Sequence, residues 1–455
     1  MILLPRSCAI ALAGLLLACA SSAQQFEAPS AFVPGDAVSL KLTGLPADAL
    51  VEIDAQRPRS EWGGPVLFRS TARFRANHRG EVDLETAVPQ EGSYQGADLR
   101  GLFWSMRPTS TAQPAAWPLN EVRLRARLGE REVAHAAVRV LNRRDGVVER
   151  HAEPFEGAAL FTPSGKGPWP VIVVLGGSEG GAQGSRAYAS LWASHGFAAL
   201  ALPYYSPPRW AAGPQGQPQQ QPPELPGLPQ HFENIAVDRL EQVHAWLLEQ
   251  PDIDSKRIAL HGGSKGAEFA LSAATRMPWI QAVVAVVPTD VVWEGWGSGT
   301  PGRSSFSWQG RPFPFVAYHG FAEGMQKLQR GQPLRLRPVH EEGRARTDAA
   351  RLEAARIPVE RFAGPLLLVG GGDDQMWASG AMARRIAERR KAAGLPTDLL
   401  VFEEAGHAIT GTGWSPTTTA NAGPMQMGGT PEADARAQGE TFPRMLAFFR
   451  QHLRR

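Results

Sequence analysis

The feature that most constrains this chain is a series of short apolar runs from residue 170 onward, with longer amphipathic stretches between them. Strands of a parallel sheet read as continuous apolar runs, because helices cover both faces of such a sheet. The alternation therefore predicts a doubly wound α/β sheet, whose ligands bind beyond the carboxyl ends of the strands. The runs are "PVIVVLGG" at 170–177, "FAALALPY" at 197–204, "RIALHG" at 257–262, "QAVVAVVP" at 281–288, "PLLLVGGG" at 365–372 and "DLLVFEEAGH" at 398–407.

Three other stretches lie between these runs. Residues 231–250 have apolar side chains at spacings of three and four, which predicts a helix with one core-facing side. Residues 213–229, rich in Pro and Gln, are predicted to be an exposed loop rather than a regular element. Residues 289–361 form a long insertion that is either a cap over the site or an extra structural layer, and the sequence favours neither. The helical stripe consists of Phe232, Ile235, Ala236, Leu240, Val243 and Leu247, and the insertion carries Trp293, Trp296, Phe306, Trp308, Phe313 and Phe315.

The N-terminal part of the chain has a different pattern. Residues 26–140 contain short runs in which apolar and polar residues alternate, separated by turn residues. This pattern predicts an antiparallel β-sandwich of the immunoglobulin-like type. Because 455 residues are too many for one ordinary core, we expect two domains, at 26–145 and 150–455, joined by a charged segment.

The first 23 residues have the layout of a secretory signal peptide. One cation, Arg6, precedes an apolar stretch that is too short to span a bilayer, and small residues lead to a cleavage site after Ala23. "LLAC" at 16–19 also resembles a lipoprotein box, so a lipid on Cys19 would attach the protein to a membrane. We expect an exported protein, periplasmic or envelope-associated. Its 2 cysteines, Cys8 and Cys19, both lie in this segment, which excludes a disulfide framework and a cysteine metal site.

The overall charge argues against a nucleic-acid partner. The formal net charge is +3, which is small for this length, and the basic clusters have the spacing of solvated helix faces. We expect a small-molecule substrate, no nucleic acid, and membrane attachment only through Cys19. The sequence predicts no oligomeric state.

A serine stands between glycines in "HGGSKGAEF", directly after the apolar run at 257–262 and before a buried helical stretch. The order of strand, sharp turn and helix around G-x-S-x-G is typical of a nucleophile elbow, which holds the serine in a strained conformation. Ser264 is therefore the candidate nucleophile. His261, just before the elbow, is interpreted as a packing residue.

A serine nucleophile needs a histidine base and an acid that orients it, and in this fold the order along the chain is Ser, acid, His. The acid is expected at the end of the run 365–372, where Asp373 and Asp374 are adjacent; one would face the histidine, and the other would brace the loop. His407 follows the last strand and is the candidate base. The competing residues are His452, which lies in a polar helix end, and Glu403 and Glu404, which lie on the strand of His407.

Acyl transfer also needs donors for the oxyanion of the tetrahedral intermediate. The backbone N–H of Lys265 is one candidate, and Gly177 or Ser178 in "GGSEGG" at 176–181 supplies the second. The phosphate-binding patterns G-x-x-x-x-G-K-[ST] and G-x-G-x-x-G do not occur in this loop, and the histidines lack metal-ligand spacing. We therefore expect neither a cofactor nor a catalytic metal.

At these residues the chain resembles a known family, the acyl-CoA thioesterases together with the bile acid-CoA:amino acid N-acyltransferases. The resemblance covers nearly the whole chain after the leader, and its blocks occur in the family's order. They are "FRANHRGEVDLETAVPQEGSYQGADLRGLFWSMRP" at 74–108, "GFAALALPYY", "GSKGAEFALS", "IPVERFAGPLLLVGGGDDQMWAS", "EAGH" and "GGTPEADARAQ".

The resemblance implies a β-sandwich followed by an α/β-hydrolase domain that acts on acyl thioesters through a Ser or Cys, Asp, His triad. It assigns the nucleophile to Ser264 and the base to His407 and, when aligned on Trp377, assigns the acid to Asp374, with Asp373 as the alternative. Family members that conjugate amino acids carry cysteine at the nucleophile position, so the serine favours water as the acyl acceptor.

The expected function is thioester hydrolysis in fatty acid or acyl-CoA metabolism. Export leaves the substrate open, because CoA esters are scarce outside the cytoplasm. The segments 213–229 and 409–429 also differ from the family's blocks. The alternatives are an exported carboxylic-ester hydrolase, an acyl-CoA:amino acid N-acyltransferase and, more remotely, a non-catalytic envelope binding protein.

Overall fold

The computed structural model describes residues 23–61, 64–109, 117–212 and 218–453. The predicted signal peptide, apart from Ala23, and both cysteines lie outside these ranges. Within them, no helix combines the length and the apolar character needed to cross a membrane.

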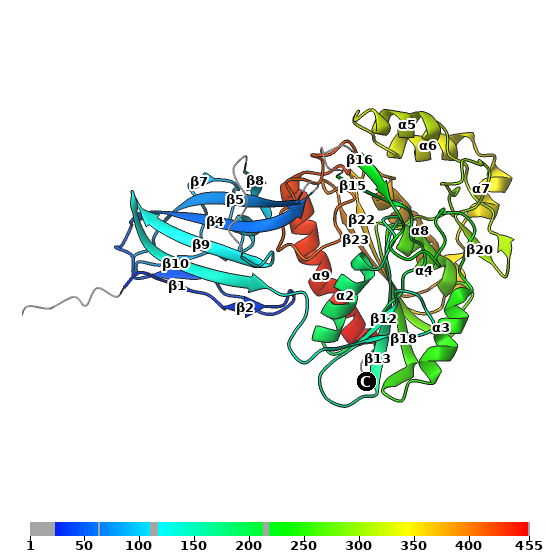
Figure 1. Cartoon of the computed structure of the whole chain (residues 1–455), viewed down its shortest axis with the longest axis horizontal. Helices are drawn as coiled ribbons and strands as arrows, with labels where there is room; N and C mark the ends of the chain where they lie inside the picture. Colours follow the sequence, from blue (N-terminus) through cyan, green and yellow to red (C-terminus); the bar gives the residue numbers. More distant parts are fainter. Residues whose placement is uncertain (1–22, 62–63, 110–116, 213–217, 454–455) are drawn as a thin grey trace, which may run out of the picture.

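Two sheets build the N-terminal domain, drawn in blue and cyan at the left of Figure 1. They share one apolar core, and every second residue of the central strand β9, Glu121–Leu128, is buried in it up to Ala126. The predicted sandwich is confirmed, and only one of its strand pairs, β2 with β10, is parallel among the described residues. One sheet contains β1 (Gln25–Glu27), β3 (Lys41–Thr43) and β6 (Val82–Asp83); the other contains β2 (Ala31–Phe32), β4 (Leu50–Glu61), β5 (Gly64–Arg75), β7 (Glu91–Gly92), β8 (Arg107–Pro108), β9 and β10 (Arg131–Val140).

An 8-stranded sheet forms the centre of the second domain. Its first two strands are antiparallel to their neighbours and the other six are parallel. This arrangement confirms the predicted α/β-hydrolase fold, and a strand overlaps each of the apolar runs. In spatial order the strands are β11 (Val148–His151), β12 (Ala159–Thr162), β14 (Ala198–Ala201), β13 (Trp169–Leu175), β18 (Ile253–Gly263), β19 (Ile280–Val286), β22 (Leu366–Gly371) and β23 (Thr397–Phe402).

Helices cover both faces of this sheet, as its apolar strands require (Figure 1). On one face, α2 (Gln183–Ser194) and α9 (Pro431–Leu453) enclose one apolar core. On the other, α3 (Arg239–Leu248), α4 (Lys265–Ala274) and α8 (Ser379–Ala392) enclose a second.

The helix predicted over 231–250 begins only at Arg239, so the prediction is wrong for its first part. Ile235 and Ala236 form strand β17, which pairs with β20, Phe306–Trp308, of the insertion. The Phe232 ring stacks on Trp296 at a centroid distance of 4.5 Å. Pairing with a segment distant in the sequence therefore overrides the local helical pattern.

The Pro- and Gln-rich segment also differs from its prediction. Arg209–Ala212 (β15) and Pro218–Gln221 (β16) pair as an antiparallel hairpin, so part of this segment is a regular element. Pro218 is the first residue of its strand, one of the positions in a sheet that tolerate a missing N–H.

The insertion at 289–361 acts both as a structural layer and as a wall of the site. Trp293 and Phe306 are at most 1% exposed, whereas Trp296 and Phe321 line a cavity beside Ser264. Its elements are β20, β21 (Arg311–Pro312), α5 (Phe321–Gln329), α6 (Arg337–Arg346), α7 (Ala349–Ala355) and a short 3-10 helix, Val359–Arg361. Figure 1 shows α5, α6 and α7 at the edge of the domain remote from the sandwich.

The sandwich contacts the second domain through the segment that follows His407. Trp414 in this segment packs edge-on against Phe32 and Phe103 of the sandwich, at centroid distances of 4.5 and 4.9 Å. Arg57 Nη1 donates to Trp414 O at 3.1 Å. The same segment carries Met427, whose carbonyl accepts from His407 N–H at 2.9 Å. The sandwich therefore supports the loop that bears the candidate base.

Candidate active site

Ser264 lies at the sharp turn between β18 and α4, beyond the carboxyl end of a central strand. Its φ of 55° and ψ of −121° form a conformation that costs a non-glycine residue about 1–3 kcal/mol and that clusters at active sites. Ser264 N–H donates to Val286 O at 2.9 Å, which ties the turn to β19. The elbow predicted from the sequence is present.

Close backbone contacts explain the glycines around Ser264. A Cβ atom on Gly262 would lie 2.1 Å from Gly266 O, and one on Gly266 would lie 2.4 Å from Gly176 O. A larger residue at Gly262 would force the elbow itself open, and one at Gly266 would push the elbow away from the end of β13. The G-x-S-x-G pattern is thus a steric requirement of this turn.

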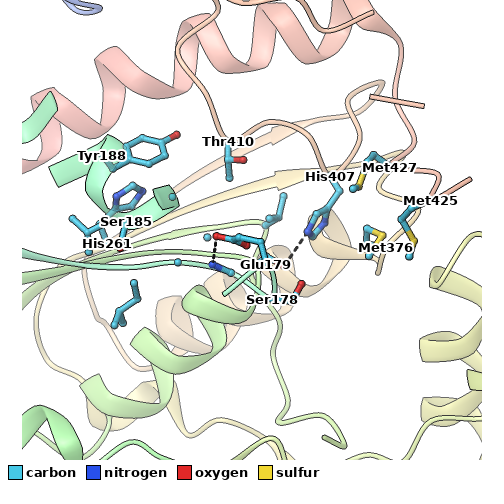
Figure 2. Close-up of a pocket in the computed structure, with 18 residues that line it drawn as sticks. Ser178, Glu179, Ser185, Tyr188, His261, Met376, His407, Thr410, Met425 and Met427 are labelled. Atoms are coloured by element: carbon cyan, nitrogen blue, oxygen red, sulfur yellow. Dashed lines mark hydrogen bonds between the residues drawn. The ribbon is translucent and has the colours of Figure 1, made fainter. Parts of the chain in front are cut away.

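Hydrogen bonds join Ser264, His407 and Asp374 in one chain. His407 Nε2 lies 3.0 Å from Ser264 Oγ, and His407 Nδ1 lies 2.8 Å from Asp374 Oδ2. Because a carboxylate can only accept, Nδ1 carries the proton and Nε2 accepts from the serine hydroxyl. Figure 2 shows His407 with the dashed line that marks its bond to the serine. The arrangement can remove a proton from Ser264 and stabilise the resulting imidazolium.

Asp374 is 0% exposed and is held by several donors. Its Oδ1 accepts from the backbone N–H groups of Met376 and Trp377 at 2.9 and 3.2 Å. Its Oδ2 accepts from Ser379 Oγ at 2.5 Å in addition to His407. These bonds fix the carboxylate in the direction of the imidazole.

Asp373 faces away from the histidine. Its Oδ2 accepts from Gly429 N–H at 3.0 Å and its Oδ1 from Gln375 Nε2 at 2.6 Å. Asp373 therefore braces the loop. This is the role that the sequence predicts for the aspartate that does not face His407. The competing residues Glu403 and Glu404 form ion pairs with arginines.

The other singled-out histidines lie apart from this chain of hydrogen bonds. His261 is 3% exposed and accepts from Trp192 Nε1 at 3.3 Å. Burial lowers the pKa of His261 to about 3, which keeps it neutral in its packing position. His452 packs on Phe448 near the end of α9, with ring centroids 4.6 Å apart. Among the described residues, no group of three or more His, Cys, Asp or Glu side chains could hold a metal ion.

The candidate oxyanion donors lie on both sides of Ser264. Lys265 is the first residue of α4, so its N–H has no acceptor within the helix. Gly177 N–H donates to the carboxylate of Glu179 at 2.9 Å, and it is therefore engaged in this structure (Figure 2). Ser178 follows in the same loop and lines the cavities at Ser264. Sequence reasoning missed Glu179, because nothing in the local pattern fixes where its side chain points.

A buried ion pair that sequence reasoning also missed supports the elbow. Lys265 Nζ donates to Glu268 Oε2 at 2.7 Å and to Ser305 Oγ at 2.8 Å. Glu268 Oε1 accepts from Trp293 N–H at 3.1 Å, so the pair connects α4 with the insertion. Burial lowers the pKa of Lys265 and raises that of Glu268, while each charge opposes the shift of the other. The i, i+3 spacing in "SKGAE" was the available sequence signal.

Replacing Lys265 by methionine is expected to lower the free energy of unfolding by about 3–5 kcal/mol, because the Glu268 carboxylate would stay buried without its partner. The double variant Lys265→Met/Glu268→Met removes both charges, so its free energy of unfolding should fall less than that of the single variant. Urea unfolding of the three proteins measures the difference. Equal stability of the single variant and wild type would contradict this account.

Asp434 also supports the turn before His407. Asp434 Oδ1 accepts from Gly406 N–H at 2.7 Å. Burial, together with the charges of Asp373 and Asp374, raises the pKa of Asp434 to about 6. No local motif connects Asp434 with His407, because the contact depends on how α9 packs beside the loop.

Two cavities meet at Ser264. The first, which we call the aromatic cavity, has a volume of about 580 Å³ and is lined by Lys265, the insertion and Trp377. The second, the glycine-loop cavity, measures about 410 Å³ and is lined by the loop 176–179 and by His407. Figure 2 shows the second cavity with Glu179 at its centre. Ser264, Ser178, Met376 and Met425 line both cavities.

Comparison with known proteins places both domains in one family. Residues 35–150 match the model of the acyl-CoA thioester hydrolase/BAAT N-terminal region, and residues 235–455 match the model of the BAAT/acyl-CoA thioester hydrolase C-terminal region. BAAT denotes the bile acid-CoA:amino acid N-acyltransferases. Residues 157–294 also match the dienelactone hydrolase family.

Curated relatives align with most of the chain. Acyl-coenzyme A thioesterase 6 of Mus musculus is 29% identical over 420 residues, which cover 85% of this chain and 87% of that protein. Acyl-coenzyme A amino acid N-acyltransferase 2 of Rattus norvegicus is 29% identical over 464 residues, covering 94% and 98%. Among solved structures, acylaminoacyl peptidase of Pyrococcus horikoshii aligns at 11% identity with a TM-score of 0.41, covering 95% of this chain and 56% of that one.

The N-terminal model of the family matches the sandwich, and its C-terminal model matches the larger part of the hydrolase domain. The chain therefore belongs to the family of acyl-CoA thioester hydrolases and bile acid-CoA:amino acid N-acyltransferases.

Proposed function

We propose that this protein is a serine hydrolase that cleaves acyl thioesters through an acyl-enzyme on Ser264. The observation that carries the proposal is the chain of hydrogen bonds from Asp374 through His407 to Ser264, in a member of a thioester hydrolase and acyltransferase family. The thioesterase relatives support the bond type.

In the proposed reaction His407 Nε2 takes the proton of Ser264 Oγ as the oxygen attacks the thioester carbonyl. The backbone N–H groups of Lys265 and Ser178, or of Gly177 once Glu179 moves away, stabilise the oxyanion. The tetrahedral intermediate collapses, the C–S bond breaks, and His407 gives its proton to the leaving thiolate. Water then attacks the acyl-enzyme with His407 again as base, and a carboxylic acid leaves.

The cavities suggest where each half of the substrate binds. The aromatic cavity is lined by Trp296, Phe321, Met325 and Leu336, so it suits an acyl chain. The glycine-loop cavity is lined by His407, which must protonate the leaving group. We therefore place the acyl chain in the aromatic cavity and the leaving group on the side of the glycine-loop cavity.

Export through the N-terminal segment is part of the proposal, on the pattern of residues 1–23. A start at Gln24 in the mature protein would make it a free exported enzyme, and a lipid on Cys19 would make it a tethered one. Mass spectrometry of the mature N-terminus distinguishes the two. An uncleaved N-terminus would contradict export by this signal.

Covalent labelling tests the function directly. A fluorophosphonate should form an adduct with the wild-type protein on the peptide that contains Ser264, and acyl-CoA substrates should release free thiol. Failure to label and failure to cleave any thioester or ester would favour a non-catalytic binding protein. Higher kcat/KM for oxygen esters than for thioesters would favour a carboxylic-ester hydrolase.

The N-acyltransferase relatives support a second candidate, transfer of the acyl group to an amine. Adding glycine or taurine to the reaction tests it, because transfer gives an amide in place of the free acid. We expect the free acid, since the resemblance that assigns the nucleophile associates cysteine, not serine, with conjugation.

A further inference from the structure

Glu179 places a carboxylate in the cavity that contains the candidate base, and the proposed mechanism has no use for it. Glu179 is an exposed residue of its loop, but its side chain lines the glycine-loop cavity. It folds back, and its Oε1 accepts from Gly177 N–H at 2.9 Å. Figure 2 shows it inside the glycine-loop cavity, between the loop and the residues around His407.

Three glycines make room for this carboxylate. A Cβ atom on Gly177 would lie 2.6 Å from Glu179 Oε2, and one on Gly184 would lie 2.8 Å from Oε1. A Cβ on Gly176 would lie 3.1 Å from Oε1. The same hypothetical Cβ on Gly177 would lie 3.5 Å from Ser264 Cβ, so the carboxylate sits close to the nucleophile. The backbone of the loop and of the first turn of α2 therefore leaves room for the carboxylate in this position.

The charge of this carboxylate is not balanced inside the cavity. Among the described residues that line the glycine-loop cavity there is no lysine and no arginine. The buried ammonium of Lys265 lines the aromatic cavity instead, and Glu268 neutralises it. A second carboxylate nearby, that of Glu224, forms an ion pair with Arg209, in which Arg209 Nη1 lies 3.8 Å from Glu224 Oε2. A leaving group in the glycine-loop cavity therefore meets the negative charge of Glu179.

We propose that Glu179 is a specificity-determining residue that selects substrates by the charge of the leaving group close to the scissile bond. Thioesters and esters with a cationic or neutral group there are favoured over those with an anionic group. This inference rests on the proposed function, which places the leaving group on the His407 side. Acyl-CoA fits this preference, because the arm next to its sulfur is neutral and its phosphates lie many bonds away, where solvent and salt screen them.

A set of thioesters that differ only in the leaving thiol tests the proposal. Octanoyl thioesters of thiocholine, N-acetylcysteamine and 3-mercaptopropionate carry a cationic, a neutral and an anionic leaving group. For each, kcat/KM is measured by thiol release with wild type, Glu179→Gln and Glu224→Gln. Glutamine keeps an acceptor for Gly177 N–H and removes the charge, and the Glu224 variant controls for a general change in surface charge.

We expect the ratio of kcat/KM for the thiocholine ester to that for the mercaptopropionate ester to fall about tenfold or more in Glu179→Gln. The interaction of two unit charges about 4 Å apart in water changes kcat/KM roughly fivefold. Removing the charge of Glu179 should change kcat/KM for the two substrates in opposite directions. The intrinsic reactivities of the thiols cancel in the comparison between proteins. The ratio should stay within about twofold in Glu224→Gln, and salt should reduce it in wild type.

Two results would overturn the inference in distinguishable ways. If wild type and Glu179→Gln show the same ratio while both cleave the neutral thioester, Glu179 does not select by charge, and the proposed function stands. If wild type cleaves none of the three thioesters and none of the acyl-CoA substrates, the proposed function fails and this inference fails with it.

Discussion

Replacing Ser264 by alanine is expected to lower kcat/KM for thioester hydrolysis by about 10³-fold or more. The reason is chemical rather than structural. Alanine accepts the backbone conformation at φ 55° no worse than serine does, but it has no oxygen with which to form the acyl-enzyme. His407 and Asp374 remain in place and can only activate water, without a nucleophile held against the carbonyl.

The measurement is thiol release from an acyl-CoA by wild type and Ser264→Ala, with fluorophosphonate labelling of both. Ser178→Ala is the matched control: it removes another hydroxyl that lines the same two cavities but keeps the backbone N–H, so we expect less than a tenfold change. Unchanged hydrolysis by Ser264→Ala would refute the acyl-enzyme mechanism. An adduct that persists in Ser264→Ala would place the reactive serine elsewhere.

The parts of the site that follow from local sequence could be predicted. Ser264 was found because a strained turn between strand and helix leaves a short pattern, in which Gly262 and Gly266 relieve contacts of 2.1 and 2.4 Å. His407 was found because the fold places the base after the last strand, where few histidines remain. The apolar runs predicted the strands, since a parallel sheet buries both faces of each strand.

The parts that depend on distant partners could not be predicted in this way. The apolar pattern of 231–250 fits a helix, but its first part pairs with β20, some 70 residues away in the chain. Glu179 turns back to Gly177 because Gly184 on α2 leaves space for its carboxylate. Asp434 reaches Gly406 only after α9 has packed. In each case the deciding contact joins residues that no spacing rule connects.

Local sequence also does not decide which of the adjacent aspartates faces His407, and substitution of each one tests the assignment. Asp374→Asn is expected to lower kcat about 10³- to 10⁴-fold. The asparagine NH₂ would donate to His407 Nδ1 where the carboxylate now accepts at 2.8 Å. The imidazole would then carry its proton on Nε2, facing Ser264, and could not accept the serine proton.

Asp373→Asn is the matched control, one residue away with the same chemical change. Its carboxylate accepts from Gly429 N–H and Gln375 rather than from the histidine, so we expect less than a tenfold loss of kcat. Circular dichroism and unfolding of both variants separate loss of the fold from loss of the proton path. A larger loss in Asp373→Asn than in Asp374→Asn would reverse the assignment of the acid. Equal and small losses in both would mean that His407 does not need a carboxylate. That result would contradict the geometry of the site, in which Asp374 is buried and has four donors around it.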